Sequence, residues 1–126
     1  MIDIEKHVVY LRNEATEDWT VATELVNSGR GRHGLFFAHL SLEKLIKARI
    51  CRHTQDIAPR IHNLVKLAET AELSLTQRQI DILAEMNVFN IEGRYPDSLI
   101  SPLSHTEAHD YLLRSEEVYQ WLIRQL

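Results

Sequence analysis

One predicted helix carries a face that changes from apolar to polar along its length. Its inward positions begin with Ile80 and Leu83 and continue, at steps of three and four, to Asn87, Asn90 and Arg94. A buried polar group costs about 1–3 kcal/mol unless it is hydrogen-bonded. These side chains therefore either pair with neighbouring helices or line a groove that a ligand fills, and the sequence leaves both interpretations open.

The residues that end this helix favour recognition of a phosphate or a base. Arg94 supplies a planar guanidinium group that matches phosphate or carboxylate geometry. Tyr95 follows it and can stack on a nucleobase. Pro96 and Asp97 come next, so the alternative is a helix end with an Arg–Asp pair.

A second polar strip lies on the most apolar predicted helix. Glu43, Lys44 and Lys47 are set among leucines and isoleucines, and Glu43 precedes Lys47 by four residues, the favourable order for an ion pair. A helix that is apolar nearly all round is a buried one, so we expect this narrow strip to face a specific target. A solvated, salt-bridged strip is the alternative. His62, at the start of the next helix, either caps that helix or reaches the same groove.

The histidine spacing gives little support for metal binding. His105 and His109 stand four residues apart, as metal ligands on a helix do, but no Glu directly follows His105 as in the His-Glu-x-x-His motif, and no third ligand is evidently placed beside them. The chain also has no phosphate-binding glycine loop, no nucleophile elbow and no paired-carboxylate motif. We therefore expect no metal and no cofactor, and residue spacing alone does not demand catalysis.

The net charge of −4 conceals a strong asymmetry. Residues 30–66 contain eight Lys or Arg and two acids, a charge of +6, so the remainder carries −10. Four of the seven histidines lie in the same window. A ligand with phosphates would find its best local field here. The alternative is a solvated helix face with acidic partners elsewhere in the fold.

Length and composition indicate one ordinary globular domain, residues 1–126. Cys51 is the one cysteine, so no internal disulfide and no thiolate zinc cluster can form. The N-terminus does not have the pattern of a signal peptide. The apolar segment around residues 35–42 is far shorter than the roughly 18 residues of a membrane span. We expect a cytoplasmic protein with no membrane contact.

Apolar periodicity and helix-stop residues predict five helices and no strand. We expect an all-α, antiparallel up-and-down bundle of four long helices and one short helix. Capping-box patterns at Thr76–Gln79 and Ser104–Glu107 mark two of the helix starts. The expected ranges are 3–27, 31–53, 62–72 (the short one), 76–94 and 104–126.

Three segments in order resemble the HEPN domain family. They are Gly34-Leu-Phe-Phe-Ala-His-Leu-Ser-Leu-Glu-Lys-Leu-Ile-Lys-Ala48, then Arg60-Ile-His-Asn-Leu64, then Asn87-Val-Phe-Asn-Ile-Glu-Gly-Arg-Tyr-Pro-Asp97. The family has a similar apolar run ending in Glu-Lys-x-x-Lys-Ala, a His-x-Leu start to its short helix and an Arg-Tyr-Pro close. The resemblance spans about residues 8 to 124.

This resemblance implies a bundle that dimerises and binds a nucleotide or RNA, acting with a separate nucleotidyltransferase in a substrate-binding or toxin–antitoxin-like role. The residues that we expect to form the nucleotide- or RNA-binding groove of this chain are Glu43, Lys44, Lys47, His62, Asn87, Asn90, Arg94 and Tyr95. Other family members are metal-independent ribonucleases with an Arg-x4–6-His motif near a late helix. Arg32 and His39 meet that spacing but lie on the second helix, so a ribonuclease is the alternative. A non-catalytic dimeric interaction module is a further alternative.

Overall fold

The computed structural model describes residues 2–92 and 103–126, and these form six α-helices and no strand. Three helices are long: α1 (Ile4–Asn27), α2 (Gly31–Thr54) and α6 (His105–Arg124). Three are short: α3 (Leu64–Thr70), α4 (Gln77–Met86) and α5 (Val88–Glu92). The expectation of an all-α fold is confirmed. No helix in the described ranges is both long and apolar enough to span a bilayer.

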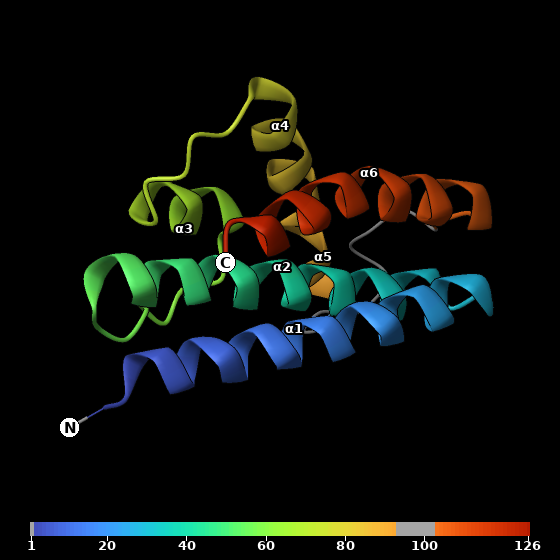
Figure 1. Cartoon of the computed structure of the whole chain (residues 1–126). Coiled ribbons are helices and arrows are strands. Elements are labelled where there is room, and N and C mark those ends of the chain that lie inside the picture. The colour runs from blue at the N-terminus through green and yellow to red at the C-terminus, as the bar shows by residue number, and fades with distance from the viewer. Residues whose placement is uncertain (1, 93–102) are drawn as a thin grey trace.

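The helices α1 and α2 form a tight antiparallel pair (Figure 1). The expected inward face of α1 is buried, and Trp19 on that face also stacks on Tyr119 of α6 with ring centroids 4.4 Å apart. Gly29 closes the turn between the two helices with φ +87°, a conformation that glycine adopts without strain. A Cβ atom at Gly34 would lie 2.8 Å from the Ala22 carbonyl oxygen, so this glycine is what allows α2 to lie against α1.

The central position expected for α2 is confirmed, because twelve of its residues are buried. The long helix α6 packs along α2 and runs in the same direction (Figure 1). Gly31 lies beside Ala108 where both helices begin, and Arg52 donates to the carbonyl oxygen of Leu126 where both end. The core between the helices is made chiefly of aliphatic side chains: Leu35, Leu42, Leu45, Ile46, Leu64, Leu67, Leu83, Met86, Phe89 and Leu122.

Both predicted capping boxes are present. Thr76 begins α4 and Ser104 begins α6, and in each box the hydroxyl accepts from the backbone N–H three residues on while that residue's side chain accepts in return. Each box satisfies two of the N–H groups that a helix start leaves unpaired. Asn63 caps α3 in a simpler way, by accepting from the Lys66 N–H.

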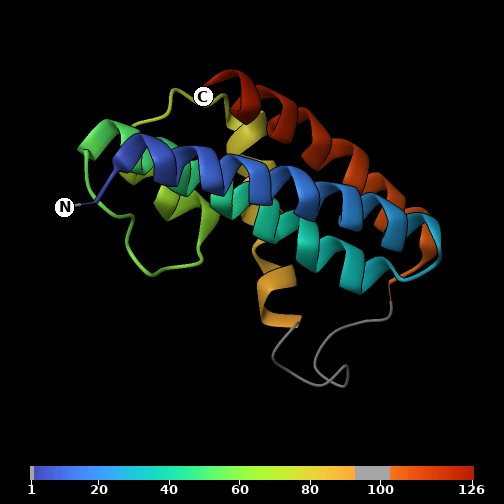
Figure 2. The ribbon, with the colours of Figure 1, turned by 60° about the horizontal axis from the view of Figure 1, so that its bottom comes forward.

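The single long helix expected over residues 76–94 is wrong. The chain breaks at Asn87 into α4 and α5, and α4 stands across the bundle, not along it (Figure 1). Figure 2 shows α5 projecting from the α2 side of the α1–α2 pair. At the break, the Asn87 N–H donates to the carbonyl oxygen of Ala84, three residues earlier, and the Asn87 side chain bonds to the start of α3. The bundle therefore has three long helices.

Candidate functional site

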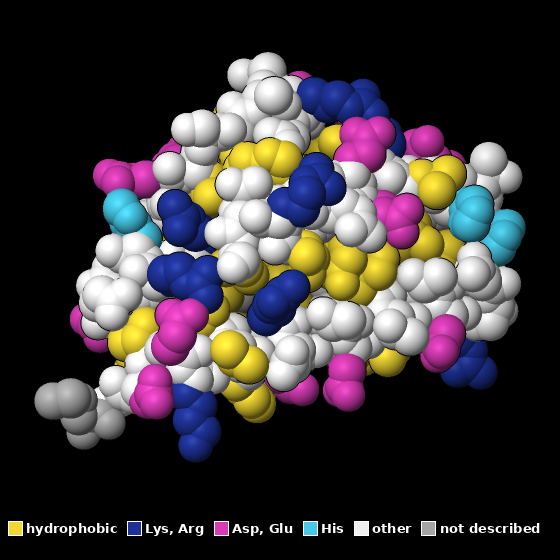
Figure 3. Space-filling view, in the orientation of Figure 1, with side chains coloured by type: hydrophobic (Ala, Val, Ile, Leu, Met, Phe, Trp, Pro, Cys, Tyr) yellow, Lys and Arg dark blue, Asp and Glu magenta, His cyan; other side chains and the backbone are white. Residues whose placement is uncertain are grey.

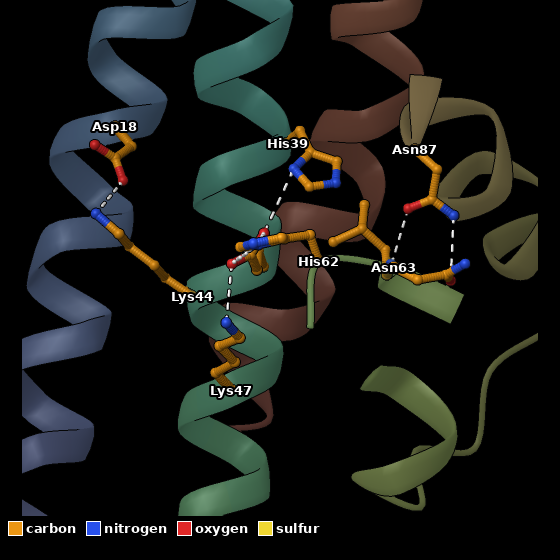
Figure 4. Close-up of polar contacts among 9 residues, drawn as sticks. Asp18, His39, Lys44, Lys47, His62, Asn63 and Asn87 are labelled. Carbon is orange, nitrogen blue, oxygen red and sulfur yellow. Dashed lines mark hydrogen bonds and ion pairs between the residues drawn. The ribbon is translucent and has the colours of Figure 1, made fainter. Parts of the chain in front are cut away.

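Polar side chains from three segments meet on one side of α2. His39, Glu43 and Lys47 follow each other at intervals of four residues, which places them on one helix face. His62 approaches them from the connector before α3, and Asn87 approaches from the α4–α5 junction (Figure 4). We call these five residues the polar stripe.

The carboxylate of Glu43 is the centre of the polar stripe. The Glu43 residue is only 5% exposed to solvent. Nδ1 of His62 lies 3.1 Å from both carboxylate oxygens, and Nζ of Lys47 donates to Oε2 at 3.0 Å. Burial of a carboxylate requires such partners, because an unpaired buried charge is strongly destabilising. The predicted interaction between Glu43 and Lys47 is thus part of a buried cluster and not a solvated strip.

His39 is the most buried member of the polar stripe, at 1% exposure. Burial lowers its pKa to about 4, and the nearby Glu43 charge, the His62 backbone and the Asn87 side chain only partly oppose this. The imidazole is therefore neutral near pH 7. Its Nδ1 lies 3.7 Å from Glu43 Oε1, which is too long for a hydrogen bond. Its Nε2 is buried and makes no hydrogen bond within the described part of the chain.

Asn87 links the polar stripe to the start of α3. Its Oδ1 accepts from the Leu64 N–H at 2.8 Å, and its Nδ2 donates to Asn63 Oδ1 at 3.3 Å. The half-buried Asn87 therefore belongs to a satisfied network between helices, one of the two interpretations that the sequence left open. The part played by Asn63 was missed, although an Asn directly before an apolar helix start is a recognisable capping signal.

Lys44 does not join the polar stripe. It extends from the other side of α2 toward α1, where Nζ lies 2.7 Å from Asp18 Oδ2 and 3.6 Å from Glu14 Oε1 (Figure 4). Adjacent residues of a helix point about 100° apart, which separates Lys44 from Glu43. The regular four-residue spacing from His39 through Glu43 to Lys47 is the sequence signal that would have identified His39, and not Lys44, as the third residue of this helix face.

The other predicted site residues are not among the five residues of the polar stripe. Asn90 is half-buried on α5. Arg32 lies on the first turn of α2, seven residues and about two helical turns before His39. Arg94 and Tyr95 lie outside the described residues.

Three of the eight Lys and Arg side chains of residues 30–66 are paired with acids. Lys44 pairs with α1, Lys47 with Glu43, and Arg52 with Glu5. Figure 3 shows Lys and Arg side chains interspersed with acidic and apolar ones, and not as a continuous basic patch. Acidic partners on another element, the alternative considered from the sequence, are therefore present for Lys44 and Arg52.

The two histidines with metal-like spacing lie on the exposed side of α6. The rings of His105 and His109 are stacked with centroids 6.0 Å apart. Within residues 2–92 and 103–126, no group of three or more His, Cys, Asp or Glu side chains could hold a metal ion.

The comparisons with known proteins agree with the helical fold. The HEPN domain model matches residues 8–126. The fold is similar to that of the protein TT1696 from Thermus thermophilus, with a TM-score of 0.79 and 16% identity, covering 94% of this chain and 98% of that one. No curated protein matches the chain. Because the family model covers nearly the whole sequence, the chain belongs to the HEPN domain family, which is associated with nucleotides and RNA.

Proposed function

We propose that the protein is a nucleotide- or RNA-binding HEPN domain that acts with a separate nucleotidyltransferase. The observation that carries this proposal is the polar stripe itself. One face of α2 carries a buried carboxylate, a partly exposed lysine and a buried imidazole nitrogen that makes no hydrogen bond to the described residues, and His62 and Asn87 approach this face from two other segments. A fold that needed only stability would be served as well by apolar side chains at these positions, so such a cluster favours a binding role.

Binding is favoured over catalysis by the state of His39. A general acid or base works best when its pKa lies near the operating pH and when it reaches the substrate. His39 has a pKa of about 4 and is 1% exposed, so near pH 7 it is a neutral, weakly basic imidazole that is shielded from solvent. Metal-independent RNA cleavage by Arg32 and His39 is the second candidate. Chelator-resistant cleavage of RNA by the pure protein, lost in His39→Ala, would support it, and intact RNA after prolonged incubation would argue against it.

The direct test is stabilisation of the protein by nucleotides. Millimolar nucleotide should raise the melting temperature of the wild type, because a ligand that binds only the folded state stabilises it. Lys47→Ala and Arg94→Ala should reduce this shift. Lys44→Ala is the matched control, since it removes a lysine of the same helix that pairs with α1 and not with the polar stripe. If no nucleotide or short RNA changes the melting temperature, the proposed function is wrong.

The proposed nucleotidyltransferase partner and the proposed homodimer are tested by separate measurements. Co-purification with a small nucleotidyltransferase encoded beside the gene would support the proposed partnership, and failure of the two proteins to co-purify when expressed together would oppose it. Light scattering would show whether the protein is the homodimer that we propose. If Arg94→Ala converts a dimer to a monomer without affecting nucleotide binding, the residue serves the interface and the non-catalytic interaction module gains support.

A further inference from the structure

The ring of His62 has one nitrogen fixed inside the polar stripe and one that is free. Its Nδ1 lies 3.1 Å from both oxygens of the Glu43 carboxylate, which Lys47 also binds (Figure 4). An ionised carboxylate can only accept hydrogen bonds, so Nδ1 carries a proton and Nε2 is the free position of the ring. Among the described residues, none forms a hydrogen bond with this Nε2, and the His62 side chain is 42% exposed. The ring therefore presents an oriented polar atom that a ligand can reach.

A second His–Glu pair of the fold provides a comparison. Nε2 of His53 lies 2.7 Å from Oε2 of Glu72, and there the imidazole and the carboxylate are both exposed, at 39% and 71%. In the polar stripe the imidazole of His62 has nearly the same exposure, but the Glu43 side chain is only 7% exposed. Burying a carboxylate costs free energy that a surface pair avoids. The buried position of Glu43 therefore favours a role in fixing the ring, beyond attachment of the connector.

The charge around this ring depends on its protonation. On α2, the charges of Glu43 and Lys47 cancel, and the buried His39 is neutral near pH 7. Asn87, which approaches from the α4–α5 junction, carries no charge. A proton on Nε2 of His62 would therefore give the site a net positive charge and make this atom a hydrogen-bond donor. An anion beside Nε2 would favour that charged form of the ring.

The chain on either side of His62 adds positive charge. Arg60 and Lys66 are exposed, and neither makes an ion pair with a described residue. The acids of the same stretch, Asp56 and Glu69, stand outside these two cations in the sequence and are also exposed. Phosphate oxygens accept hydrogen bonds and are attracted by a positive field, whereas an uncharged base or ribose gains little from it.

We propose that Nε2 of His62 binds a phosphate oxygen of the nucleotide or RNA ligand as a charged N–H donor, with Glu43 as the positioning residue. This inference rests on the proposed function and names the phosphate as the group that the polar stripe recognises. On binding, the imidazole takes a proton from solvent at Nε2, while Nδ1 keeps its bond to Glu43. Binding of a phosphate is therefore linked to the uptake of a proton by the protein.

Calorimetric titration at pH 8, in buffers of different ionisation enthalpy, measures affinity and proton uptake together. A phosphate monoester is already ionised at this pH, because its second pKa is about 6, so a proton that is taken up goes to the protein. We expect a nucleoside triphosphate to bind at least about tenfold more tightly than its nucleoside, with proton uptake, and tripolyphosphate to compete with it. A short RNA without terminal phosphates that binds with similar uptake would place a backbone phosphate at Nε2.

The same titrations separate failure of this inference from failure of the proposed function. A nucleoside that binds as tightly as its triphosphate, or phosphate binding without proton uptake, would overturn the inference and leave the proposed function intact. Absence of binding by nucleosides, nucleotides and RNA would overturn both.

Two variants of His62 distinguish ligand binding from attachment of the connector. His62→Asn keeps an N–H near the position of Nδ1 and removes Nε2. We expect it to melt within about 2 °C of the wild type, with triphosphate affinity reduced at least about fivefold and no proton uptake. His62→Gln places an amide N–H near the position of Nε2 and should retain part of the affinity, without uptake.

The matched control is His53→Asn, which alters the surface His–Glu pair and leaves the polar stripe unchanged. It should bind the triphosphate with the affinity and proton uptake of the wild type. A His62→Asn protein that binds phosphates normally and still takes up a proton would contradict the inference.

Discussion

Nδ1 of His62 lies 3.1 Å from each carboxylate oxygen of Glu43, so the connector between α2 and α3 is attached to the middle of the central helix. The contact joins residues 19 positions apart and brings a half-exposed imidazole onto a buried acid. Since Glu43 is also bound by Lys47, one carboxylate satisfies groups from two segments. The stability of the connector should therefore depend on this one side chain.

Replacing Glu43 tests that dependence. Glu43→Ala removes the acceptor of both His62 and Lys47 and leaves a cavity, so we expect the free energy of unfolding to fall by about 2–3 kcal/mol. Urea denaturation at pH 7 would measure it. Glu116→Ala, an exposed acid on α6, is the matched control and should change stability by less than about 0.5 kcal/mol. Equal stability of the two variants would show that the Glu43 cluster does not hold the connector.

Much of the helical framework could be predicted from the sequence because its signals are local. Periodic apolar residues gave the ranges of α1, α2 and α6 to within one or two residues, and the boxes at Thr76 and Ser104 placed two helix starts. In each case the residues that determine the element lie within it. The expectation that α2 is central followed from its shortage of polar positions. This is again a local signal, because it can be read from the residues of α2 alone.

The parts that could not be predicted depend on contacts between distant segments. At the break, the Asn87 side chain bonds to the Leu64 N–H, 23 residues earlier, and nothing within residues 76–94 indicates that partner. Lys44 is a second case, since the acids that bind it lie on α1, whereas the Glu43–Lys47 pair lies within α2 and was expected from its four-residue spacing. His39 could be placed beside Glu43 from spacing, but its burial to 1% exposure depends on distant segments, with His62 and Asn87 among its neighbours.

Stability should fall in mildly acidic solution because of His39. Its pKa is lowered from 6.5 to about 4 in the folded state, so below pH 6.5 the unfolded chain binds the proton more readily. The free energy of unfolding is therefore unaffected by His39 above pH 6.5. It decreases as the pH falls toward 4, by about 3 kcal/mol over that range. Urea midpoints between pH 7 and 4 would measure the slope. His39→Leu should flatten it, and an unchanged slope in that variant would assign the acid sensitivity to other groups.

The bonds of Asn87 should contribute more to stability than those of an ordinary surface amide. Asn87→Ala leaves the Leu64 N–H at the start of α3 without its acceptor and removes a donor from Asn63, so we expect a loss of about 1–3 kcal/mol. Asn13→Ala on the exposed side of α1 is the control and should have little effect. Hydrogen exchange would locate the change, with faster exchange in α3 expected for Asn87→Ala. Unchanged protection of α3 would show that the amide contact is not what anchors this helix.

Gly34 gives a prediction in which two effects on stability have opposite signs. In the interior of a helix, replacing glycine by alanine normally stabilises by about 1 kcal/mol, because alanine has the higher helix propensity. Here the added Cβ would lie 2.6 Å from Cγ2 of Val26 and 2.8 Å from the carbonyl oxygen of Ala22, so α1 and α2 would have to move apart. Overpacking of this kind costs about 1–3 kcal/mol, and the contact with backbone atoms of α1 leaves little room for adjustment.

We therefore expect Gly34→Ala to be destabilised by about 1–2 kcal/mol in urea denaturation, despite its gain in propensity. The variant Gly34→Ala/Val26→Ala separates the causes, because removing the Val26 methyl groups relieves one clash and leaves the clash with the Ala22 backbone. Partial recovery in the double variant, relative to Val26→Ala alone, would support close packing as the reason for glycine here. A stabilised Gly34→Ala protein would mean that α1 and α2 are not packed as closely as the structure shows.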